Sequence, residues 1–255
     1  MKNIIVERKN GIFIVKLNRP EVRNAINSQT AEELDQAWRE FDEDAESGVG
    51  IIASSSENFC SGADLKDIES LSKRAMNPEG PLGMTRRTLK KPVIAAISGY
   101  CVAGGFEIAL WADIRICEIT TKFGFLERRF GVPLIDGGTQ RLPLVSGLGN
   151  ALYLILTGKL IDANEALRMG IVSEIVPEGK VLEKAIELAE SILSYPQITL
   201  RSDRDAVYSG IRIDPGIMYE QKNGFYVLQS HVPEEGSRIF ASGKGRKGAN
   251  LERDT

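Results

Sequence analysis

Two glutamates, Glu107 and Glu127, each carry a carboxyl group in an otherwise apolar stretch of the chain. Glu107 follows Gly104-Gly105 and precedes the apolar run 108–111, and Glu127 follows the run 123–126. A charged carboxylate is costly in an apolar setting, so we expect Glu127 to hold a partner or to have a raised pKa. Two carboxyl groups that met over one water would leave one protonated and one charged, as the addition of water to a double bond requires. Glu107 alone could simply stabilise the N-terminus of a helix.

The number of histidines limits the kinds of metal site and catalytic group that the chain can form. The chain has a single histidine, His231, near its C-terminal end. A cluster of histidine metal ligands is therefore excluded, and a Ser-His-Asp triad would depend on this one residue. We expect His231 at a solvated helix end and expect no metal site. Catalysis must then use carboxylates, backbone dipoles or a bound group.

The composition is that of a globular protein, with 255 residues of which 42% are hydrophobic and 26% charged. The net charge of −3 argues against a nucleic-acid binder, which usually has a basic surface. No apolar stretch approaches the roughly 20 residues that span a bilayer. The three cysteines lie far apart and in no CxxC spacing, which predicts neither a zinc site nor a disulfide framework. Met1 leads directly into a strand-like run, so we expect no signal peptide and a reducing, cytoplasmic setting.

Two glycine-bearing turns, 58–66 and 99–107, each follow an apolar strand-like run. Where a strand gives way to a helix, the first backbone N–H groups have no partner within the helix and can point at an anion. Two such groups aimed at one oxygen form an oxyanion hole. For either turn alone, the simpler interpretation is that small residues permit tight packing.

The elements that must hold these residues follow from periodicity. Asn10-Gly11 predicts a hairpin turn between two strands, and a helix begins near Ser28 with Thr30 and Glu33 as its capping box. Strands that alternate with helices indicate an α/β fold with a largely parallel sheet. The expected strands are 3–8, 12–17, 49–53, 92–97 and 113–119.

The second half of the chain reads mostly as helix from Gly137 onward. Residues 178–193 have strong helical periodicity, and Tyr195-Pro196 ends that helix. We therefore divide the chain into a core, 1–195, and a helical region, 196–255. Residues 68–90 lack clear periodicity, which predicts either a mobile loop that acts as a lid or a plain surface linker.

Taken together, the motifs resemble those of the crotonase superfamily over nearly the whole chain, and most closely those of its enoyl-CoA hydratases. The resemblance implies an α/β fold, a spiral of repeated ββα units, followed by a C-terminal α-helical trimerisation region. It also implies a homotrimer or a dimer of trimers (a homohexamer). The motifs lie at 17–20, 23–25, 59–65, 99–110, 112–114, 123–127 and 137–142.

The same resemblance implies that the ligand is an acyl-CoA thioester, whose CoA is part of the substrate and not a separate cofactor. The oxyanion-hole N–H donors would be those of Ala63 and Gly104. Lys244 and Arg246 would reach the CoA of a neighbouring subunit. The residues implied to bind CoA are Arg23, Ser61, Ala63, Asp64, Leu65 and Lys66.

In the hydratases, the two catalytic glutamates match Glu107 and Glu127 here. By resemblance, Glu107 would take a proton from the water that attacks C3, and Glu127 would give a proton to C2. The product of this syn addition to trans-2-enoyl-CoA would be 3-hydroxyacyl-CoA, a lyase reaction of fatty acid metabolism. Because both positions are Glu, the resemblance favours a hydratase over members of the superfamily that keep one acid or neither.

Two positions depart from the hydratase pattern. Ala103 stands where a third glycine is common, which is a mild change. Asp136 stands where a small residue is common, at a position similar to that of the nucleophilic aspartate in aromatic dehalogenases. Asp136 could instead be the N-cap of the helix that follows, which is the favoured interpretation.

Alternative functions therefore remain at this point. One is an enoyl-CoA isomerase that moves a proton between C4 and C2 with Glu127 alone. Another is a hydrolase or dehalogenase that uses Asp136 covalently. An RNA-binding role, known for some crotonase-like proteins, is disfavoured by the acidic composition.

Overall fold

A six-stranded sheet forms the centre of the molecule in the computed structural model, which describes residues 1–211 and 213–243. Its strand order is β1-β2-β3-β4-β6-β9. The first pair is antiparallel and each later pair is parallel. The strands are β1 (Ile4–Lys9), β2 (Ile12–Leu17), β3 (Val49–Ser54), β4 (Val93–Ile97), β6 (Ile114–Glu118) and β9 (Glu174–Val176).

A smaller sheet lies across one end of the large one and has the order β5-β7-β8. Its strands are β5 (Tyr100–Val102), β7 (Lys122–Gly124) and β8 (Ile161–Asp162). The chain passes from β4 to β5 and then into α3 (Gly104–Trp111), and it passes in the same way from β6 to β7 and on to α4 (Gly138–Thr157). Each of these turns is a ββα unit, which confirms the predicted α/β spiral.

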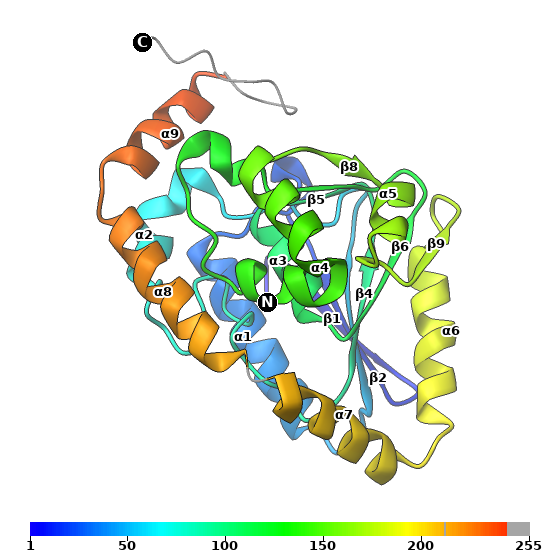
Figure 1. Ribbon diagram of the computed structural model, residues 1–255. Helices are drawn as coiled ribbons and strands as arrows, with labels where there is room; N and C mark the ends of the chain where they lie inside the picture. Colours follow the sequence, from blue (N-terminus) through cyan, green and yellow to red (C-terminus); the bar gives the residue numbers. More distant parts are fainter. Residues whose placement is uncertain (212, 244–255) are drawn as a thin grey trace.

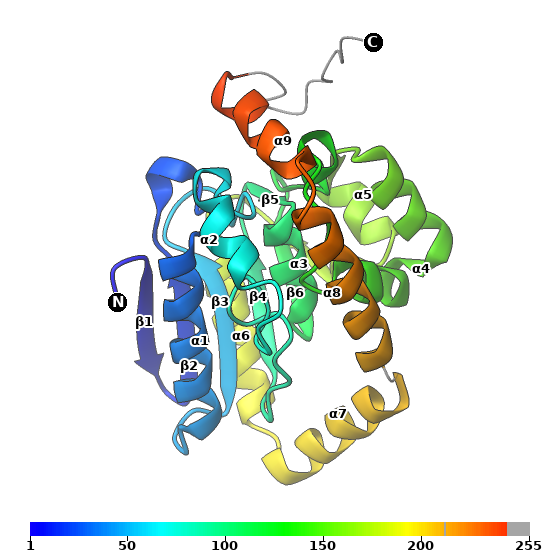
Figure 2. The same cartoon turned by 90° about the vertical axis from the view of Figure 1, so that its left-hand side faces the viewer.

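The five predicted strands form within one residue of their expected bounds, as β1, β2, β3, β4 and β6, whereas β9 and the strands of the smaller sheet were not predicted. Asn10 and Gly11 both have positive φ, 50° and 80°, as the expected hairpin turn requires. Alternate residues of β2 then face opposite sides of the large sheet: Phe13 belongs to one core cluster and Ile14 to the other. Helix α1 (Ser28–Glu43) covers the first face and α6 (Val181–Leu193) covers the second, as Figures 1 and 2 show.

The start of α1 differs from the prediction. Asn27 is the N-cap, because its Oδ1 accepts a hydrogen bond from the N–H of Thr30 at 2.8 Å. The carboxylate of Glu33 turns away and accepts N–H groups at the beginning of the chain, those of Lys2, Asn3 and Ile4. The predicted Thr30–Glu33 capping box is therefore wrong, since the carboxylate serves distant backbone groups that carry no local signal.

Residues 68–90 also differ from the prediction. They contain α2 (Ile68–Lys73) and then a series of turns with buried side chains, among them Leu82 and Thr85. The guanidinium of Arg86 donates hydrogen bonds to the carbonyl oxygens of Ala75, Asn77 and Ile135 and so fastens the segment on both sides. It is neither a structureless loop nor a plain surface linker.

The remaining helices lie around this core. Short 3-10 helices are η1 (Pro20–Val22), η2 (Leu65–Asp67) and η3 (Leu126–Phe130), and α5 (Ala163–Arg168) follows α4. Helices α7 (Gln197–Ile211), α8 (Asp214–Leu228) and α9 (Val232–Ala241) run along the outside of the molecule after Pro196. None of the helices within the described ranges is long and apolar enough to cross a bilayer.

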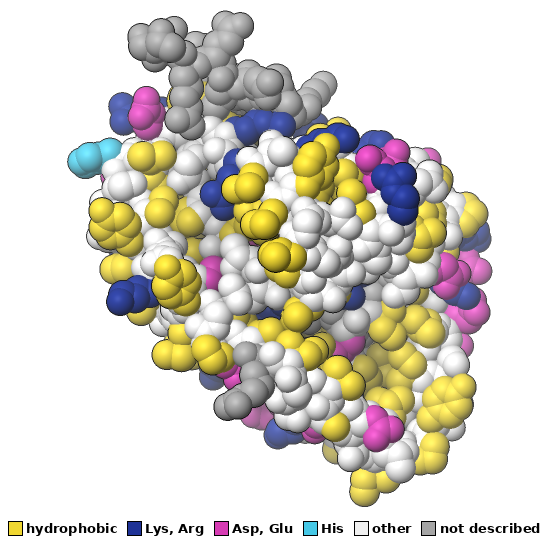
Figure 3. All heavy atoms as spheres, viewed as in Figure 1, with side chains coloured by type: hydrophobic (Ala, Val, Ile, Leu, Met, Phe, Trp, Pro, Cys, Tyr) yellow, Lys and Arg dark blue, Asp and Glu magenta, His cyan; other side chains and the backbone are white. Residues whose placement is uncertain are grey.

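Exposed apolar side chains gather on the outer helices. Helix α4 bends at Gly147, and beyond that point Leu148, Leu152 and Leu156 follow at intervals of four residues, 66%, 46% and 73% exposed. Residues four apart share one face of a helix, so these leucines form a continuous stripe, and Figure 3 shows hydrophobic side chains over this part of the surface. We call Leu148, Leu152 and Leu156 the α4 stripe.

Gly83 tests whether residues 68–90 are packed as described. An added Cβ at Gly83, where φ is 84°, would lie 1.8 Å from the carbonyl oxygen of Ala31 in α1. Gly179 has a similar φ of 76° but no atom within 4 Å of an added Cβ. We expect Gly179→Ala to lower the free energy of unfolding by about 1–2 kcal/mol through backbone strain alone. Gly83→Ala should lower it by more than about 3 kcal/mol in the same denaturant titration. Equal losses would contradict the packing of this segment on α1.

Candidate active site

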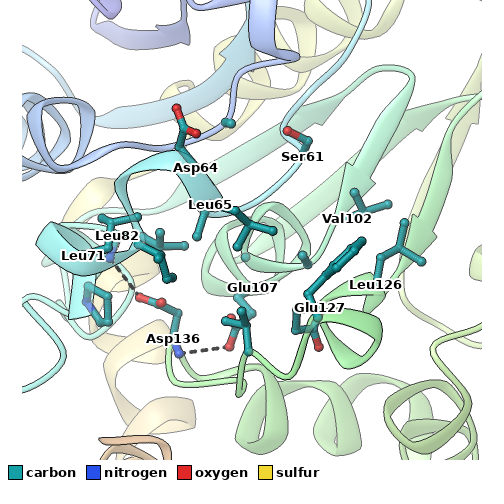
Figure 4. Close-up of a pocket in the computed structure, with 18 of the residues that line it drawn as sticks. Ser61, Asp64, Leu65, Leu71, Leu82, Val102, Glu107, Leu126, Glu127 and Asp136 are labelled. Carbon is teal, nitrogen blue, oxygen red and sulfur yellow. Dashed lines mark hydrogen bonds between the residues drawn. The ribbon is translucent and has the colours of Figure 1, made fainter. Parts of the chain in front are cut away.

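A cavity of about 490 Å³ lies between the two glycine-bearing turns, η3, the start of α4 and the C-terminal helices. Figure 4 shows Ser61 and Asp64 near one end of this cavity and Glu107 and Glu127 near the other. The structure brings all the candidate site residues to its wall, although they come from separate segments. These are Arg23, Ser61, Ala63, Asp64, Leu65, Lys66, Gly104, Glu107, Glu127 and Asp136.

Two backbone N–H groups lie together at the junction of the glycine-bearing turns. An ideal Cβ on Gly104 would lie 3.5 Å from the nitrogen of Ala63, so the two turns touch with no side chain between them. Within residues 1–211 and 213–243, neither the N–H of Ala63 nor that of Gly104 donates a hydrogen bond. These groups are free to stabilise negative charge on one bound oxygen.

Ala103 sets the direction of the Gly104 N–H. Its φ of 52° and ψ of −130° lie where a residue with a Cβ is strained, at a cost of about 1–3 kcal/mol. The N–H of Ala103 donates to the carbonyl oxygen of Gly124 in β7, and this bond holds the conformation. Alanine at position 103 therefore places backbone strain directly beside the two free N–H groups.

Glu107 sits on α3, a helix whose residues are all buried. Its Oε1 accepts hydrogen bonds from the N–H groups of Asp136 at 3.0 Å and of Gly138 at 2.9 Å. Burial raises the pKa of Glu107 well above 4.5, and the nearby charges of Asp136 and Glu220 raise it further. The bond from Gly138 opposes this rise, because it favours the charged form.

Glu127 lies on η3, with its carboxyl group in the same cavity. No hydrogen bond from another residue of the described ranges reaches either carboxyl oxygen, and Nε of Arg128 is 3.9 Å from Oε1. Burial raises the pKa of Glu127 to about 8, against smaller opposing effects from its own N–H and from Arg128. The expected raised pKa is confirmed, and Glu127 is protonated near neutral pH.

The two acids therefore differ in environment while they share a cavity. Burial favours the neutral acid at both positions, but only Glu107 has backbone donors from other residues that stabilise its carboxylate. An oxygen bound by Ala63 and Gly104 would lie in the same cavity. Such an arrangement can take a proton at one position, deliver one at another, and stabilise the charge that develops between the two steps.

Asp136 does not cap the helix that follows it. The N-cap of α4 is Gly137, and no side chain caps it there. The Oδ1 of Asp136 instead accepts hydrogen bonds from the N–H of Leu82, at 3.3 Å, and from the hydroxyl of Thr85. The favoured N-cap interpretation is wrong because these donors come from residues 68–90, which were expected to be a loop or a linker. Asp136 is buried and lines the cavity as a third acid.

Apolar residues from distant segments complete the cavity, and sequence reasoning did not find them. Leu82 comes from the segment after α2, Ile135 from the chain before α4, and Leu228 and Phe240 from the C-terminal helices. Hydrophobic residues of this kind are common in any core, so no local signal shows that these four line a cavity. Leu126 and Phe130 also line the cavity, whereas Phe106 and Phe125 stack on each other in the core, with ring centroids 4.8 Å apart.

The opposite end of the cavity is polar. The guanidinium of Arg19 pairs with Asp64 at 3.1 Å, and that of Arg23 lies over the ring of Tyr100, 5.6 Å from its centroid. Lys66 and Ser61 lie on the same wall. Lys244 and Arg246, implied above to reach a neighbouring subunit, lie outside the described residues.

The chain resembles proteins of known activity over nearly its whole length. The family model described as enoyl-CoA hydratase/isomerase matches residues 7–242. A short-chain-enoyl-CoA hydratase of Clostridium acetobutylicum is 35% identical over 87% of this chain and 88% of its own. A crotonyl-CoA hydratase of Syntrophomonas wolfei is 34% identical over 84% of each chain.

Solved structures show the same fold. A carnitinyl-CoA hydratase from Mycobacterium avium superposes with a TM-score of 0.86 at 30% identity, over 95% of this chain and 97% of its own. An enoyl-CoA hydratase from Mycobacterium tuberculosis superposes with a TM-score of 0.78 at 32% identity, over the same shares.

The raised pKa of Glu127 predicts a pH-dependent stability. Between pH 4.5, the ordinary pKa of a glutamate, and about pH 8, the folded protein holds a proton on Glu127 that the unfolded chain has released. The free energy of unfolding therefore falls as the pH rises through this window. We expect Glu127→Gln, which removes the titration, to become more stable relative to the wild type between about pH 5 and about pH 8 in denaturant titrations. Glu69→Gln, at an exposed side chain of α2, is the control and should show no such trend. A constant difference for Glu127→Gln would show that the carboxyl is not buried as described.

Proposed function

The chain belongs to the enoyl-CoA hydratase/isomerase family, and we propose that it is a lyase that adds water to trans-2-enoyl-CoA to give 3-hydroxyacyl-CoA. One observation carries the proposal. Two buried carboxyl groups, those of Glu107 and Glu127, face one cavity together with the free N–H groups of Ala63 and Gly104. A hydratase needs a base, an acid and an oxyanion hole, and these residues provide one of each.

In the proposed reaction, the thioester carbonyl oxygen accepts hydrogen bonds from Ala63 and Gly104. Glu107 takes a proton from a water whose oxygen bonds to C3, and the electrons of the double bond move to form an enolate. The two N–H groups stabilise the negative charge on the enolate oxygen. Glu127 then delivers its proton to C2. Glu107 ends with one proton more and Glu127 with one fewer, and exchange with solvent restores both.

The environments of the two acids support these roles. A carboxyl group with a pKa of about 8 holds its proton at neutral pH, as a general acid must. The base is anchored by two backbone N–H groups through Oε1, so its geometry is fixed before substrate binds. A raised pKa also makes the carboxylate of Glu107 a stronger proton acceptor than an ordinary glutamate.

We further propose that the polar end of the cavity binds CoA, which enters as part of the substrate. The segment from Ala63 to Lys66 would lie along the adenine and pantetheine, and Arg23 would contact a phosphate. All of these residues line the cavity beside the two free N–H groups, which supports the assignment. The apolar end, with Leu82, Ile135 and Leu228, would then receive the acyl chain.

Asp136 keeps a second function open, because it lines the same cavity. As a nucleophile it would form an acyl- or aryl-enzyme, the chemistry of a hydrolase or dehalogenase. Its Oδ1 is already occupied by the N–H of Leu82 and the hydroxyl of Thr85, which favours a fixed neighbour of Glu107 over a nucleophile. In an isomerase that uses Glu127 alone, the two hydrogen bonds that anchor the Glu107 carboxylate would have no catalytic role.

We also propose that the protein works in the cytoplasm as a homotrimer or a dimer of trimers. The three cysteines are buried and free, which supports a reducing setting. The α4 stripe supports self-association, since exposed apolar patches on a soluble protein often mark contact surfaces.

The acid–base roles predict a specific loss of activity. We expect Glu107→Gln and Glu127→Gln each to lower the kcat for hydration of crotonyl-CoA by at least about 100-fold, because each removes a proton acceptor or donor. The loss of the conjugated enoyl thioester's ultraviolet absorbance measures this rate. Glu118→Gln is the matched control: Glu118 is also buried with a raised pKa, but it lies outside this cavity and should leave kcat near the wild-type value.

Three results would contradict the assignment. The first is a wild type that leaves short and long 2-enoyl-CoA substrates unchanged. The second is conversion of 3-enoyl-CoA to the conjugated isomer without hydration, which would indicate an isomerase. An acyl adduct on Asp136, detected by mass spectrometry of the trapped enzyme, would indicate covalent catalysis.

The proposed assembly depends on the α4 stripe. We expect the double variant Leu148→Glu/Leu152→Glu to lose the oligomer, because two buried charges in an apolar contact are costly. Light scattering after size-exclusion chromatography measures the mass. Leu167→Glu on α5, at a leucine 43% exposed, is the control and should leave the mass unchanged. A wild type that runs as a monomer, or a double variant that keeps its mass, would refute this surface.

A further inference from the structure

Four consecutive backbone N–H groups at the start of α4 alternate between two carboxylates. Those of Asp136 and Gly138 donate to Glu107, at 3.0 and 2.9 Å. Those of Gly137 and Thr139 donate to Glu220, at 2.6 and 3.0 Å. The hydroxyl of Thr139 also donates to Glu220. Residues 136–139 therefore form a link between Glu107 in α3 and Glu220 in α8.

From this link we propose that Glu220 is a positioning residue for Glu107, an inference that rests on the hydratase function proposed above. Glu107 has one oxygen fixed by the link, and its geometry depends on where residues 136–138 lie. Glu220 holds the same residues from the other side, and it is 6% exposed. Without its carboxylate, the N–H groups of Gly137 and Thr139 lose their partners and the link is free to shift. Glu220 itself is not among the residues that line the cavity.

The glycines of α8 allow the contact between Glu220 and the start of α4. Gly216, Glu220 and Gly224 follow at intervals of four and lie on one face of α8. A Cβ added at Gly216 would lie 1.8 Å from Gln140 Oε1, and one added at Gly224 would lie 1.6 Å from Cγ2 of Ile135. Glycine on both sides of Glu220 thus allows α8 to approach residues 135–140 closely enough for its carboxylate to reach their backbone.

The charges around the link give Glu220 a second effect on Glu107. Three acids, Glu107, Asp136 and Glu220, lie among the guanidinium groups of Arg86 and Arg141. The charge of Glu220 raises the pKa of Glu107, so a neutral residue at 220 should lower that pKa. The other titratable groups that act on this cluster are Glu79, Glu127 and Tyr208.

The test compares Glu220→Ala and Glu220→Gln with a matched control, Glu33→Ala. Glu33 is also buried and accepts several backbone N–H groups, but these lie at the start of the chain, in β1 and just before it. We expect Glu220→Ala to lower kcat for crotonyl-CoA by about tenfold or more, with KM changed by less than about threefold. Glu220→Gln keeps one acceptor oxygen and should recover part of that loss. In both Glu220 variants the acidic limb of the kcat pH profile should move to lower pH. Glu33→Ala should lose thermal stability but keep the wild-type kcat and the wild-type pH profile.

A readout without turnover separates this inference from the function on which it rests. The carboxyl infrared band that disappears in Glu107→Gln reports the protonation of Glu107 in the wild type. We expect its titration midpoint to fall in Glu220→Gln. If the wild type hydrates crotonyl-CoA and the Glu220 variants keep its kcat and pH profile, the positioning role is wrong. An unchanged infrared midpoint in folded Glu220→Gln would overturn it even if the wild type had no hydratase activity.

Discussion

The arrangement of the chain around the cavity depends on one requirement. The buried carboxyl group of Glu107 needs hydrogen-bond donors. Every residue of helix α3 is buried, so the outer surface of the protein offers Glu107 no water to satisfy its carboxylate. Its donors must come from another part of the backbone, and the chain that leads into α4 brings them. The approach leaves no room at Gly138, where an added Cβ would lie 2.9 Å from the carboxylate. The Glu107 side chain thus constrains the path of residues 136–138 from one side.

The ββα arrangement explains why the two free N–H groups lie next to each other. Cys60 pairs with Cys101 as a parallel bridge, and Ile26 pairs in the same way with Ala63. The Cys60–Cys101 bridge aligns the two glycine-bearing turns beyond the ends of β3 and β4, and the Ile26–Ala63 bridge ties the first turn to the chain before α1. Once the turns are aligned, the N–H of Ala63 and the start of α3 face one space. The parallel sheet therefore brings together the backbone N–H groups of the proposed oxyanion hole, and the elements that follow add the two acids.

Local pattern was enough to predict much of this molecule from its sequence. The hairpin at Asn10-Gly11, the buried strands and the apolar settings of Glu107 and Glu127 all depend on neighbours within a few residues. The features that the sequence did not predict depend on residues that lie far apart in the chain. Glu33 serves backbone groups about 30 residues away, Asp136 meets donors more than 50 residues earlier, and Glu220 lies about 80 residues beyond its donors. A sequence shows that such a carboxyl group exists, but folding decides which distant N–H group it meets.

The cavity is finished by the last part of the chain. Leu228 and Phe240 form part of its wall, and Glu220 holds the start of α4. A ribosome makes both acids of the reaction, at 107 and 127, long before it reaches these helices. The cavity wall is therefore complete only when α8 and α9 have folded against the core that carries both proposed acids. An intermediate with a folded core and these two helices undocked would hold both acids beside an open wall.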